Sequence, residues 1–385
     1  MASRKGLVEL KEESDGQEIY SGFKDINDKE FSDDIKLRSN KRIKLIIIFS
    51  IVILILVTII VVVVVLTKKD TNQNETKDPI DPDEIPIIID VDEGGDDMVA
   101  YIVANNSRKF KILGVTTVTP SYYIDNVTDI WLRLLDYMNF DNKIYSGEEH
   151  PLQRPAQKET FHHDYQIDFP LTNRNKENES AVNFMINTIK NYPKKVTLFL
   201  LAPLTNFAKA FQMDKSIINN IKEIIIMGGT KGSGNMPLNP HAEYNIYQDA
   251  EAANIVFNCG VKIKVFGTDV TNKIEFTDEI YKKFMEMNTK SSYLTHQVMK
   301  GTFLTWGDNI LHDPVTFLYY LNNDIIQLKD YYCIVNTSNP DVSGTNYGTI
   351  HFFEPDDDHK ANIQYSENIN TDLYWKTLEE LVKKY

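Results

Sequence analysis

The chain has 385 residues, a formal net charge of −14 and a pI of about 5.1. This length suffices for one large domain or two ordinary ones. The acidic balance argues against a nucleic-acid partner, which normally meets a basic face, and it is compatible with divalent cations and neutral small molecules. The two cysteines, Cys259 and Cys333, allow at most one disulfide, and two ordinary buried thiols are favoured.

The N-terminal part of the chain resembles a membrane anchor with a cytoplasmic tail. Residues 1–44 are polar and charge-dense and are predicted to form a disordered tail. Residues 45–66 contain no charged side chain. A bilayer core requires about 20 apolar residues in a helix, so this run predicts one transmembrane helix that places the chain in the lipid bilayer. The run is too long and begins too late for a cleaved signal peptide.

The charges that flank the apolar run predict its orientation. Five basic residues precede the run and only two follow it closely: Lys36, Arg38, Lys41, Arg42 and Lys44 before it, Lys68 and Lys69 after it. The positive-inside rule therefore predicts a single-pass type II membrane protein whose C-terminal bulk is extracellular or luminal.

Residues 67–84 are polar with spaced prolines and are predicted to form a short stem. Glycosylation sequons follow the apolar run at Asn74, Asn105, Asn126, Asn178 and Asn336. They permit a luminal location and a glycoprotein, although an Asn-rich chain contains such matches by chance.

Segments with strand and helix character alternate from residue 85 onward. The expected strands are residues 85–91, 111–119, 196–203, 221–229 and 262–270, and the expected helices are residues 96–106, 127–139, 181–192, 204–212 and 249–260, with further helices beyond. Near-continuous apolar strands that alternate with helices are typical of a mainly parallel, doubly wound (Rossmann-like) sheet. Residues 85–385 are therefore predicted to form one α/β domain.

Polar side chains gather where the expected strands end, which is where open α/β sheets bind ligands. Asp90, Asp92, Asp96 and Asp97 follow the first strand, and Thr205 follows the third. The loop after residue 229 carries polar residues as well. Farther along, "LHDPV" places a histidine beside an aspartate at the head of an apolar helix.

Each of these groups also has an ordinary interpretation. Asp96 and Asp97 suit the first turn of a helix, where the dipole favours acids. Asp313 followed by proline suits a helix start. His312 alone suits a partly buried histidine, and Glu243 and Asn245 suit a polar loop. Taken singly, these interpretations are the more common ones.

Taken together, the acidic residues indicate a cation site. Carboxylates such as Asp90 and Asp92 at the end of a buried strand are costly without compensation. Several carboxylates and a backbone carbonyl are the ligands that Ca²⁺ prefers, whereas Zn²⁺ favours histidine and cysteine. An EF-hand is excluded because its ligand spacing is absent.

The motifs of residues 85–320 resemble, in order, those of the inosine-uridine-preferring nucleoside hydrolase family. They are "DVDEGGDDMVA", "APLTNFA", "IIIMGG", "AEYNIYQDAEAANIVF", "GTDVT" and "LHDPVTFLYYL". The resemblance implies a Ca²⁺-dependent N-ribohydrolase that cleaves the N-glycosidic bond of purine or pyrimidine ribonucleosides to free base and ribose, in nucleoside salvage. It is compatible with a homodimer or a homotetramer.

The same resemblance implies the roles of individual residues. Metal ligands would be Asp92, Asp97, Asp313 and the main-chain carbonyl of Thr205. Ribose ligands would be Asp96, Asn235, Glu243, Asn245 and Asp313. Asp92 would take a proton from the water bound to the metal, and His312 would protonate the leaving base. Asp90 would support the loop from behind the metal ligands.

Three departures from the family pattern concern the rim of the site. Glu93 replaces a proline, Pro120 and Ser121 stand where the family carries Gly-Asn, and His162 and His163 lack the glycines of the family's flap motif. The change at Pro120 and Ser121 removes an expected ribose-side asparagine. The metal ligands and the other ribose ligands are retained, whereas the region that reads the base is altered.

Two other functions remain open at this point. The altered loops are compatible with a hydrolase-like surface protein that binds nucleosides or ribose with poor turnover. The strand-end Asp-x-Asp in "IIIDVDEGG" superficially fits an aspartate-nucleophile phosphatase. The retained His312–Asp313 pair argues against the first, and "GGDD" leading directly into the next helix argues against the second.

Overall fold

The computed structural model describes residues 43–45, 47–59, 83–119, 123–154, 169–236, 239–306, 309–338 and 346–385. The chain divides into two compact units, Met1–Ile80 and Asp81–Tyr385. Residues 43–45 and 47–59 are helical and exposed. Among all the residues described, no helix is both long enough and apolar enough to span a bilayer. Residues 1–42 of the predicted tail, residues 46 and 60–66 of the predicted span, and most of the predicted stem lie outside the described residues.

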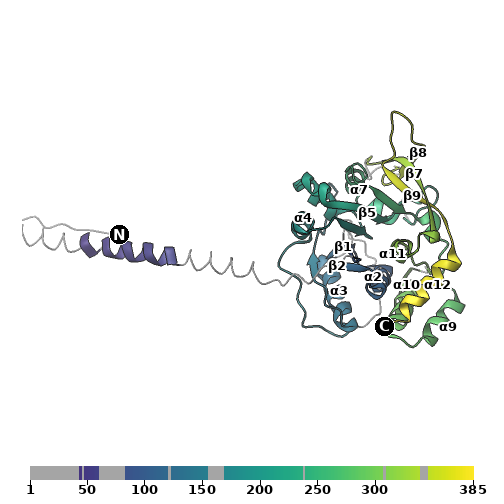
Figure 1. Ribbon diagram of the computed structural model, residues 1–385, viewed down its shortest axis with the longest axis horizontal. Helices are drawn as coiled ribbons and strands as arrows, with labels where there is room; N and C mark the ends of the chain where they lie inside the picture. Colours follow the sequence, from purple (N-terminus) through teal and green to yellow (C-terminus); the bar gives the residue numbers. More distant parts are fainter. Residues whose placement is uncertain are drawn as a thin grey trace, which may run out of the picture. The chain divides into compact units, whose positions relative to one another are not determined.

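The second unit is built on one twisted sheet (Figure 1). In spatial order its strands are β3 (Ile144–Ser146), β2 (Phe110–Thr117), β1 (Ile85–Val91), β4 (Val196–Leu200), β5 (Ile221–Met227), β6 (Ile263–Phe266), β9 (Ile363–Ile369), β7 (Ile326–Val335) and β8 (Ile350–Phe353). Neighbours from β3 through to β9 pair in parallel, and β7 pairs antiparallel with β9 and β8. The prediction of a mainly parallel α/β sheet is confirmed.

Helices cover both faces of this sheet. They are α2 (Gly95–Ser107), α3 (Ile124–Met138), α4 (Ala181–Asn191), α5 (Thr205–Met213), α6 (Tyr244–Gln248), α7 (Ala250–Phe257), α8 (Thr268–Thr271), α9 (Asp278–Glu286), α10 (Lys290–Trp306), α11 (Pro314–Leu321) and α12 (Thr371–Val382), with 3-10 turns η1 (Lys215–Asn220) and η2 (Asn323–Ile325). Two hydrophobic clusters result, one with residues of α2, α3 and α11 and one with residues of α4, α5 and α7.

The burial of β1 explains why the central strands are apolar throughout. Ile87 and Ile89 belong to one cluster, and Ile88 between them belongs to the other, because successive side chains of a strand point to opposite faces. A strand covered on both faces therefore has no polar alternation until it ends. The polar residues that follow β1 mark the edge where the sheet meets the site.

Three features differ from the prediction. Strand β6 ends at Phe266, and Thr268–Thr271 form helix α8 instead of continuing the strand. The segment after α11 forms β7, β8 and β9, where further helices were expected. Strand β7 alternates between buried and exposed residues, because its antiparallel pairing lies toward the edge of the sheet and leaves part of one face in water. The three-residue strand β3 is too short to give a sequence signal.

Cys259 and Cys333 are buried free thiols, as favoured above.

Candidate active site

The carboxyl end of β1 turns directly into α2 and carries two buried carboxylates. Asp92 and Asp97 are 9% and 2% exposed. Oδ1 of Asp92 accepts a hydrogen bond from the Gly94 amide at 2.7 Å, and the Asp92 amide donates to Oδ1 of Asp97 at 3.4 Å. The backbone of Gly94 has a φ of −60°, which any residue adopts. Glycine is needed there for space, because a Cβ would lie 2.2 Å from Oδ2 of Asp97.

A third carboxylate reaches the same place from a distant part of the chain. Asp313 precedes α11 and is 2% exposed, and its side chain makes no capping hydrogen bond to that helix. Carboxylate oxygens of Asp96, Asp97 and Asp313 lie within 4.8 Å of one another. Among the described contacts, Asp313 therefore does not act as an ordinary helix cap. Its carboxylate instead converges with those of Asp96 and Asp97.

Electrostatics make this cluster unfavourable without a counter-charge. Burial raises the pKa of Asp97 well above its ordinary value, and the charges of Asp313 and Asp92 raise it further. Burial likewise raises the pKa of Asp313, followed by the charges of Asp96 and Asp92. Burial and the neighbouring Glu93 raise the pKa of Asp92. Oxygen donors of this kind suit a hard divalent cation such as Ca²⁺, which would relieve the repulsion.

Asp90 lies behind these acids inside the sheet. Its Oδ1 accepts hydrogen bonds from Thr116 Oγ1 at 2.5 Å and Asn206 Nδ2 at 2.8 Å. Its Oδ2 has no hydrogen-bond partner among the described residues. Burial raises the pKa of Asp90 to about 7, although both hydrogen bonds lower it. Asp90 thus ties β1 to β2 and to α5 directly beneath the acidic turn.

Thr205 opens α5 at the end of β4, the strand that neighbours β1. Its hydroxyl donates to Oδ2 of Asp249 at 2.7 Å, and the Leu152 amide donates to the same oxygen at 2.9 Å. Asp249 is fully buried, so it fixes the start of α5 from beneath. Because β4 runs parallel to β1, its carboxyl end places Thr205 at the same edge of the sheet as Asp92.

The loop after β5 brings two buried polar residues to the site. Glu243 caps α6, and its carboxylate accepts hydrogen bonds from the amides of Gly229, Asn245 and Ile246 at 2.9, 2.9 and 3.1 Å. Burial raises its pKa, which those backbone bonds and the charge of His312 partly offset.

Asn245 and Asn235 differ in their surroundings. Asn245 is 6% exposed, and its Nδ2 donates to the carbonyls of Leu201 at 2.7 Å and Met227 at 3.2 Å. Asn235 is exposed, and its Oδ1 accepts from the Tyr244 amide at 2.7 Å. Asn245 therefore locks the ends of β4 and β5 together, whereas Asn235 stabilises the loop surface.

His312 sits between the acidic cluster and a short helix. Its Nδ1 lies 2.7 Å from the hydroxyl of Thr271 in α8, and its backbone amide donates to Oδ2 of Asp96 at 3.3 Å. The influence of His312 on the pKa of Glu243 places the imidazole within electrostatic reach of that carboxylate. The site thus combines clustered acids, a buried Glu243 and one oriented imidazole.

Several residues of this site were not singled out from the sequence. Thr271 and Asp249 act through hydrogen bonds to predicted residues, and the motifs that contain them, "GTDVT" and "QDAEAA", were noted without a role for either. Asn206 follows the third expected strand beside Thr205, and its hydrogen bond to Asp90 was not predicted. Glu93, which stands where a proline was expected, is 3% exposed beside Asp92. The altered positions Pro120, Ser121, His162 and His163 lie outside the described residues.

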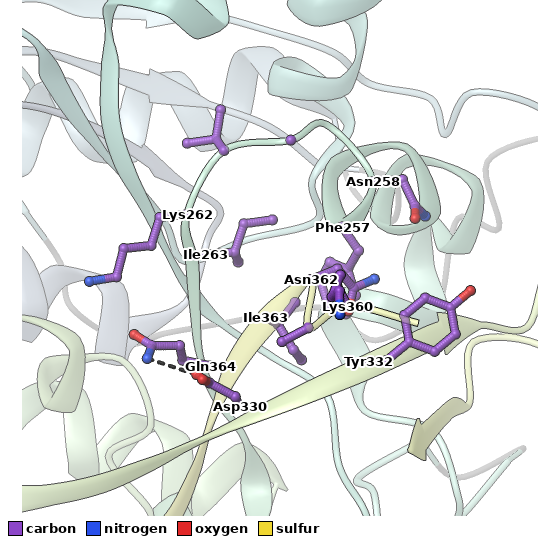
Figure 2. Close-up of a pocket in the computed structure, with 13 residues that line it drawn as sticks. Phe257, Asn258, Lys262, Ile263, Asp330, Tyr332, Lys360, Asn362, Ile363 and Gln364 are labelled. Carbon is purple, nitrogen blue, oxygen red and sulfur yellow. Dashed lines mark hydrogen bonds between the residues drawn. The ribbon is translucent and has the colours of Figure 1, made fainter. Parts of the chain in front are cut away.

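A surface hollow of about 550 Å³ lies elsewhere, at the amino ends of β6 and β9 (Figure 2). Its lining includes Lys262, Asp330 and Gln364, and Gln364 donates to Asp330 at 2.9 Å. No predicted site residue lines it. The acidic cluster lies at the opposite, carboxyl edge of the parallel strands, so the hollow is separate from the candidate active site.

The mainly parallel sheet with a carboxylate cluster at its carboxyl edge is the arrangement expected of a nucleoside hydrolase. The family model described as inosine-uridine preferring nucleoside hydrolase matches residues 87–376, and the chain belongs to this family. It is accordingly an enzyme that hydrolyses N-glycosidic bonds of ribonucleosides.

Curated and solved relatives agree with this assignment. The pyrimidine-specific ribonucleoside hydrolase RihB of Escherichia coli O1:K1 / APEC is 30% identical over 310 residues, which cover 78% of this chain and 97% of RihB. A plant nucleoside hydrolase, the PpNRh1 enzyme, is similar in structure with a TM-score of 0.69 and 25% identity over 78% of this chain and 99% of that one. The purine-preferring ribonucleoside hydrolase from Gardnerella vaginalis shares the fold with a TM-score of 0.68 and 24% identity, covering 77% of this chain and 99% of its own.

Proposed function

We propose that this chain is a calcium-dependent N-ribohydrolase that splits purine or pyrimidine ribonucleosides into free base and ribose for nucleoside salvage. The observation that supports it most strongly is the convergence of Asp96, Asp97 and Asp313 within 4.8 Å. The names of the relatives include both purine-preferring and pyrimidine-specific enzymes, so the proposal covers both classes of base.

The carboxylates have distinct parts in this proposal. Asp92, Asp97 and Asp313, with the carbonyl of Thr205, would hold the cation. A bound Ca²⁺ would polarise and orient a water molecule. Asp92 accepts the proton of the attacking water, and the Gly94 amide positions its carboxylate at the turn.

The remaining residues hold the sugar and activate the base. Asp96, Glu243 and Asn245 bind ribose hydroxyls as buried or half-buried acceptors, with Asn235 at the loop surface. The acids also stabilise the oxocarbenium-like transition state of glycoside cleavage by their negative charge. His312 donates a proton to the leaving base, and Thr271 holds its ring in position.

The proposal is tested with the purified full-length chain and a panel of inosine, uridine, adenosine and guanosine. Reducing sugar is measured in calcium and again after chelation. The expected result is ribose release from at least one purine or pyrimidine nucleoside, lost with chelator and restored by calcium. Tight nucleoside binding without ribose release would instead identify a nucleoside-binding protein with little or no catalytic activity. Hydrolysis of p-nitrophenyl phosphate with magnesium, and of no nucleoside, would identify a phosphatase.

We further propose that residues 45–66 anchor the enzyme as a type II membrane protein with the catalytic domain extracellular or luminal. The proposal is supported by the uncharged sequence and by exposed apolar side chains on the helix at 47–59, such as Leu54, which is 67% exposed. Exposed sequons at Asn126 and Asn178 would then carry glycans. Resistance to alkaline extraction from membranes and a glycosidase-sensitive mass shift are expected. Complete release by alkali would contradict the anchor.

A further inference from the structure

The turn that follows β5 determines where the carboxylate of Glu243 lies. The amide of Gly229 donates to Oε2 of Glu243 at 2.9 Å. Gly229 has a φ of +75°, a left-handed conformation that favours glycine, and a Cβ there would lie 2.6 Å from Cδ1 of Ile350. The direction of this amide is therefore fixed by an uncommon backbone conformation, and the surrounding contacts must hold it.

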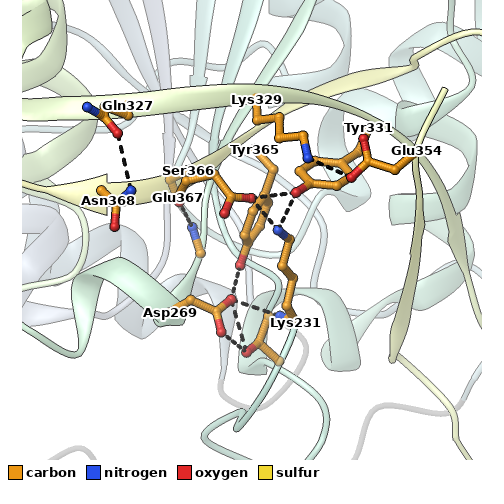
Figure 3. A network of polar contacts seen from close by, with 12 residues as sticks. Lys231, Asp269, Gln327, Lys329, Tyr331, Glu354, Tyr365, Ser366, Glu367 and Asn368 are labelled. Carbon is orange, nitrogen blue, oxygen red and sulfur yellow. Dashed lines mark hydrogen bonds and ion pairs between the residues drawn. The ribbon is translucent and has the colours of Figure 1, made fainter.

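The carbonyl side of the same turn is contacted from α8 and from β9, the last strand of the chain. The carbonyl of Gly229 accepts a hydrogen bond from the Thr268 amide at 3.0 Å, and the hydroxyl of Tyr365 lies 3.4 Å from it. The Tyr365 hydroxyl donates to Oδ2 of Asp269 at 2.5 Å (Figure 3). Tyr365 is fully buried.

Asp269 extends this support along the loop. Its Oδ2 also accepts a hydrogen bond from the amide of Lys231 at 2.8 Å, and the Thr230 hydroxyl lies 3.4 Å from it. The side chain of Lys231 continues toward β9 and β7, where it pairs with Glu367 and donates to the hydroxyl of Tyr331 (Figure 3). One carboxylate thus joins Tyr365 of β9 to two consecutive residues, Thr230 and Lys231, of the loop that leads to Glu243.

The close packing around the hydroxyl of Tyr365 shows that it has a defined place. A Cβ at Gly267 would lie 1.7 Å from that hydroxyl oxygen, so only glycine at this position admits it. The Gly267 amide in turn donates to Oγ of Ser366 at 3.0 Å. The ring of Tyr365 packs edge-on against Phe352, with centroids 4.7 Å apart. Removing the hydroxyl alone would leave this packing in place.

We propose that Tyr365 and Asp269 are positioning residues for sugar recognition, which act through the Gly229 peptide on the carboxylate of Glu243. This inference rests on the proposed function, since it assigns Glu243 to a ribose hydroxyl. Neither side chain touches the sugar in this scheme. They fix the turn whose amide directs the carboxylate, and so they couple the C-terminal β9 to the substrate site.

The test compares Tyr365→Phe with Glu243→Gln and with the double variant. Each is assayed on uridine and inosine and on their 2′-, 3′- and 5′-deoxy analogues. Loss of one hydrogen bond that positions a ligand group predicts about a tenfold fall in kcat/KM for Tyr365→Phe. On the analogue that lacks the hydroxyl bound by Glu243, kcat/KM of either single variant should be almost equal to that of the wild type, because the contact is already missing. The double variant should resemble Glu243→Gln, because the two changes act on one contact.

Tyr320→Phe is the matched control. The Tyr320 hydroxyl also donates to a buried carboxylate, that of Glu223, but Glu223 lies near the amino end of β5, away from Gly229. This variant should change thermal stability without changing preference among the analogues. Asp269→Asn serves as the second variant if Tyr365→Phe does not fold, and it should give the same analogue pattern.

The inference is overturned if Tyr365→Phe leaves kcat/KM unchanged, if its loss is equal on every analogue, or if the double variant is additive. If the wild-type chain releases no ribose, the proposed function fails, and calorimetric titration with uridine becomes the test. A weaker Kd in Tyr365→Phe but not in Tyr320→Phe then supports the positioning role. An equal Kd, or no binding by any form, overturns it.

Discussion

The hydroxyl of Thr271 lies 2.7 Å from Nδ1 of His312. Thr271 ends α8, and His312 lies just before α11, so the contact joins segments that are 41 residues apart. A hydrogen bond to one ring nitrogen fixes the orientation of an imidazole, and a hydroxyl can donate to that nitrogen or accept from it. Thr271 is fully buried, which makes this orientation rigid. In the proposed function, this contact orients His312, the proposed proton donor, toward the leaving base.

Thr271→Val removes that hydrogen bond while it keeps the shape of the side chain. If His312 protonates the leaving base, kcat/KM for inosine or uridine should fall on the order of tenfold to a hundredfold. A p-nitrophenyl riboside should be hydrolysed almost as well as by the wild type, because its leaving group departs without a proton. Thr271→Ser keeps the hydroxyl and should restore nucleoside hydrolysis. Equal losses on both kinds of substrate would show that Thr271 has only a structural role.

Calcium should stabilise the folded chain through the carboxylate cluster. A ligand present at 100 times its Kd adds about 2.7 kcal/mol to the free energy of unfolding. The melting temperature of the wild type should therefore rise with calcium, whereas that of Asp97→Asn should not. In chelator, Asp97→Asn should melt above the wild type, because one of several buried like charges has been removed.

Asp125→Asn is the control for this experiment. Asp125 is an exposed acid that pairs with Lys176, and its side chain is 80% exposed. This variant should gain as much stability from calcium as the wild type does. If calcium raises the melting temperature of Asp97→Asn as much as that of Asp125→Asn, the carboxylate cluster is not the calcium site.

Glu223 should contribute a pH-dependent part of the stability. Burial would raise its pKa, but hydrogen bonds from Lys264, at 2.6 Å, and from Tyr320 outweigh burial and lower it. A carboxylate whose pKa is depressed by folding stabilises the protein above its unfolded pKa of about 4.3, and this stabilisation is lost as the pH falls through the folded pKa. Glu223→Gln should therefore lower the free energy of unfolding by about 3 kcal/mol at neutral pH, since Lys264 is left buried.

The measurement is denaturant unfolding of the wild type and Glu223→Gln from pH 7 down to pH 3. The difference in free energy of unfolding between the two proteins should shrink below about pH 4.3. Glu354→Gln removes an exposed pair with Lys329 and should leave the free energy of unfolding almost unchanged at any pH. A difference for Glu223→Gln that is constant across this range would show that its charge is not the source of the stabilisation.

The sequence predicts the parallel core and the acidic edge for a physical reason. Strands such as β1 are buried on both faces and read as apolar runs, and parallel strands bring their carboxyl ends to one edge. Asp92 and Asp97 could therefore be placed together from sequence alone. The local sequence around Asp313 explains it equally well as a helix cap. Only the three-dimensional structure shows that it converges with Asp96 and Asp97 and makes no capping hydrogen bond.

Other parts could not be predicted because their signals are tertiary. The short α8 looks like the continuation of β6, and only the approach of Tyr365 to Gly267 shows why the chain turns there. Strand β9 carries Tyr365 close to Gly229, more than a hundred residues earlier in the chain. No local periodicity reveals such a contact. Glu93 is buried beside Asp92, and we have no physical account of its presence there.

The most direct test of the central claim is product stoichiometry with the full-length chain in calcium and without phosphate. Free base is measured by chromatography and ribose by a reducing-sugar assay, with uridine or inosine as the substrate. The account predicts equal amounts of base and ribose from the wild type and from Asp125→Asn, and at least about a hundredfold slower release from Asp92→Asn, which lacks the base for the attacking water. Base without free ribose, no product from either nucleoside, or full activity in Asp92→Asn would contradict it.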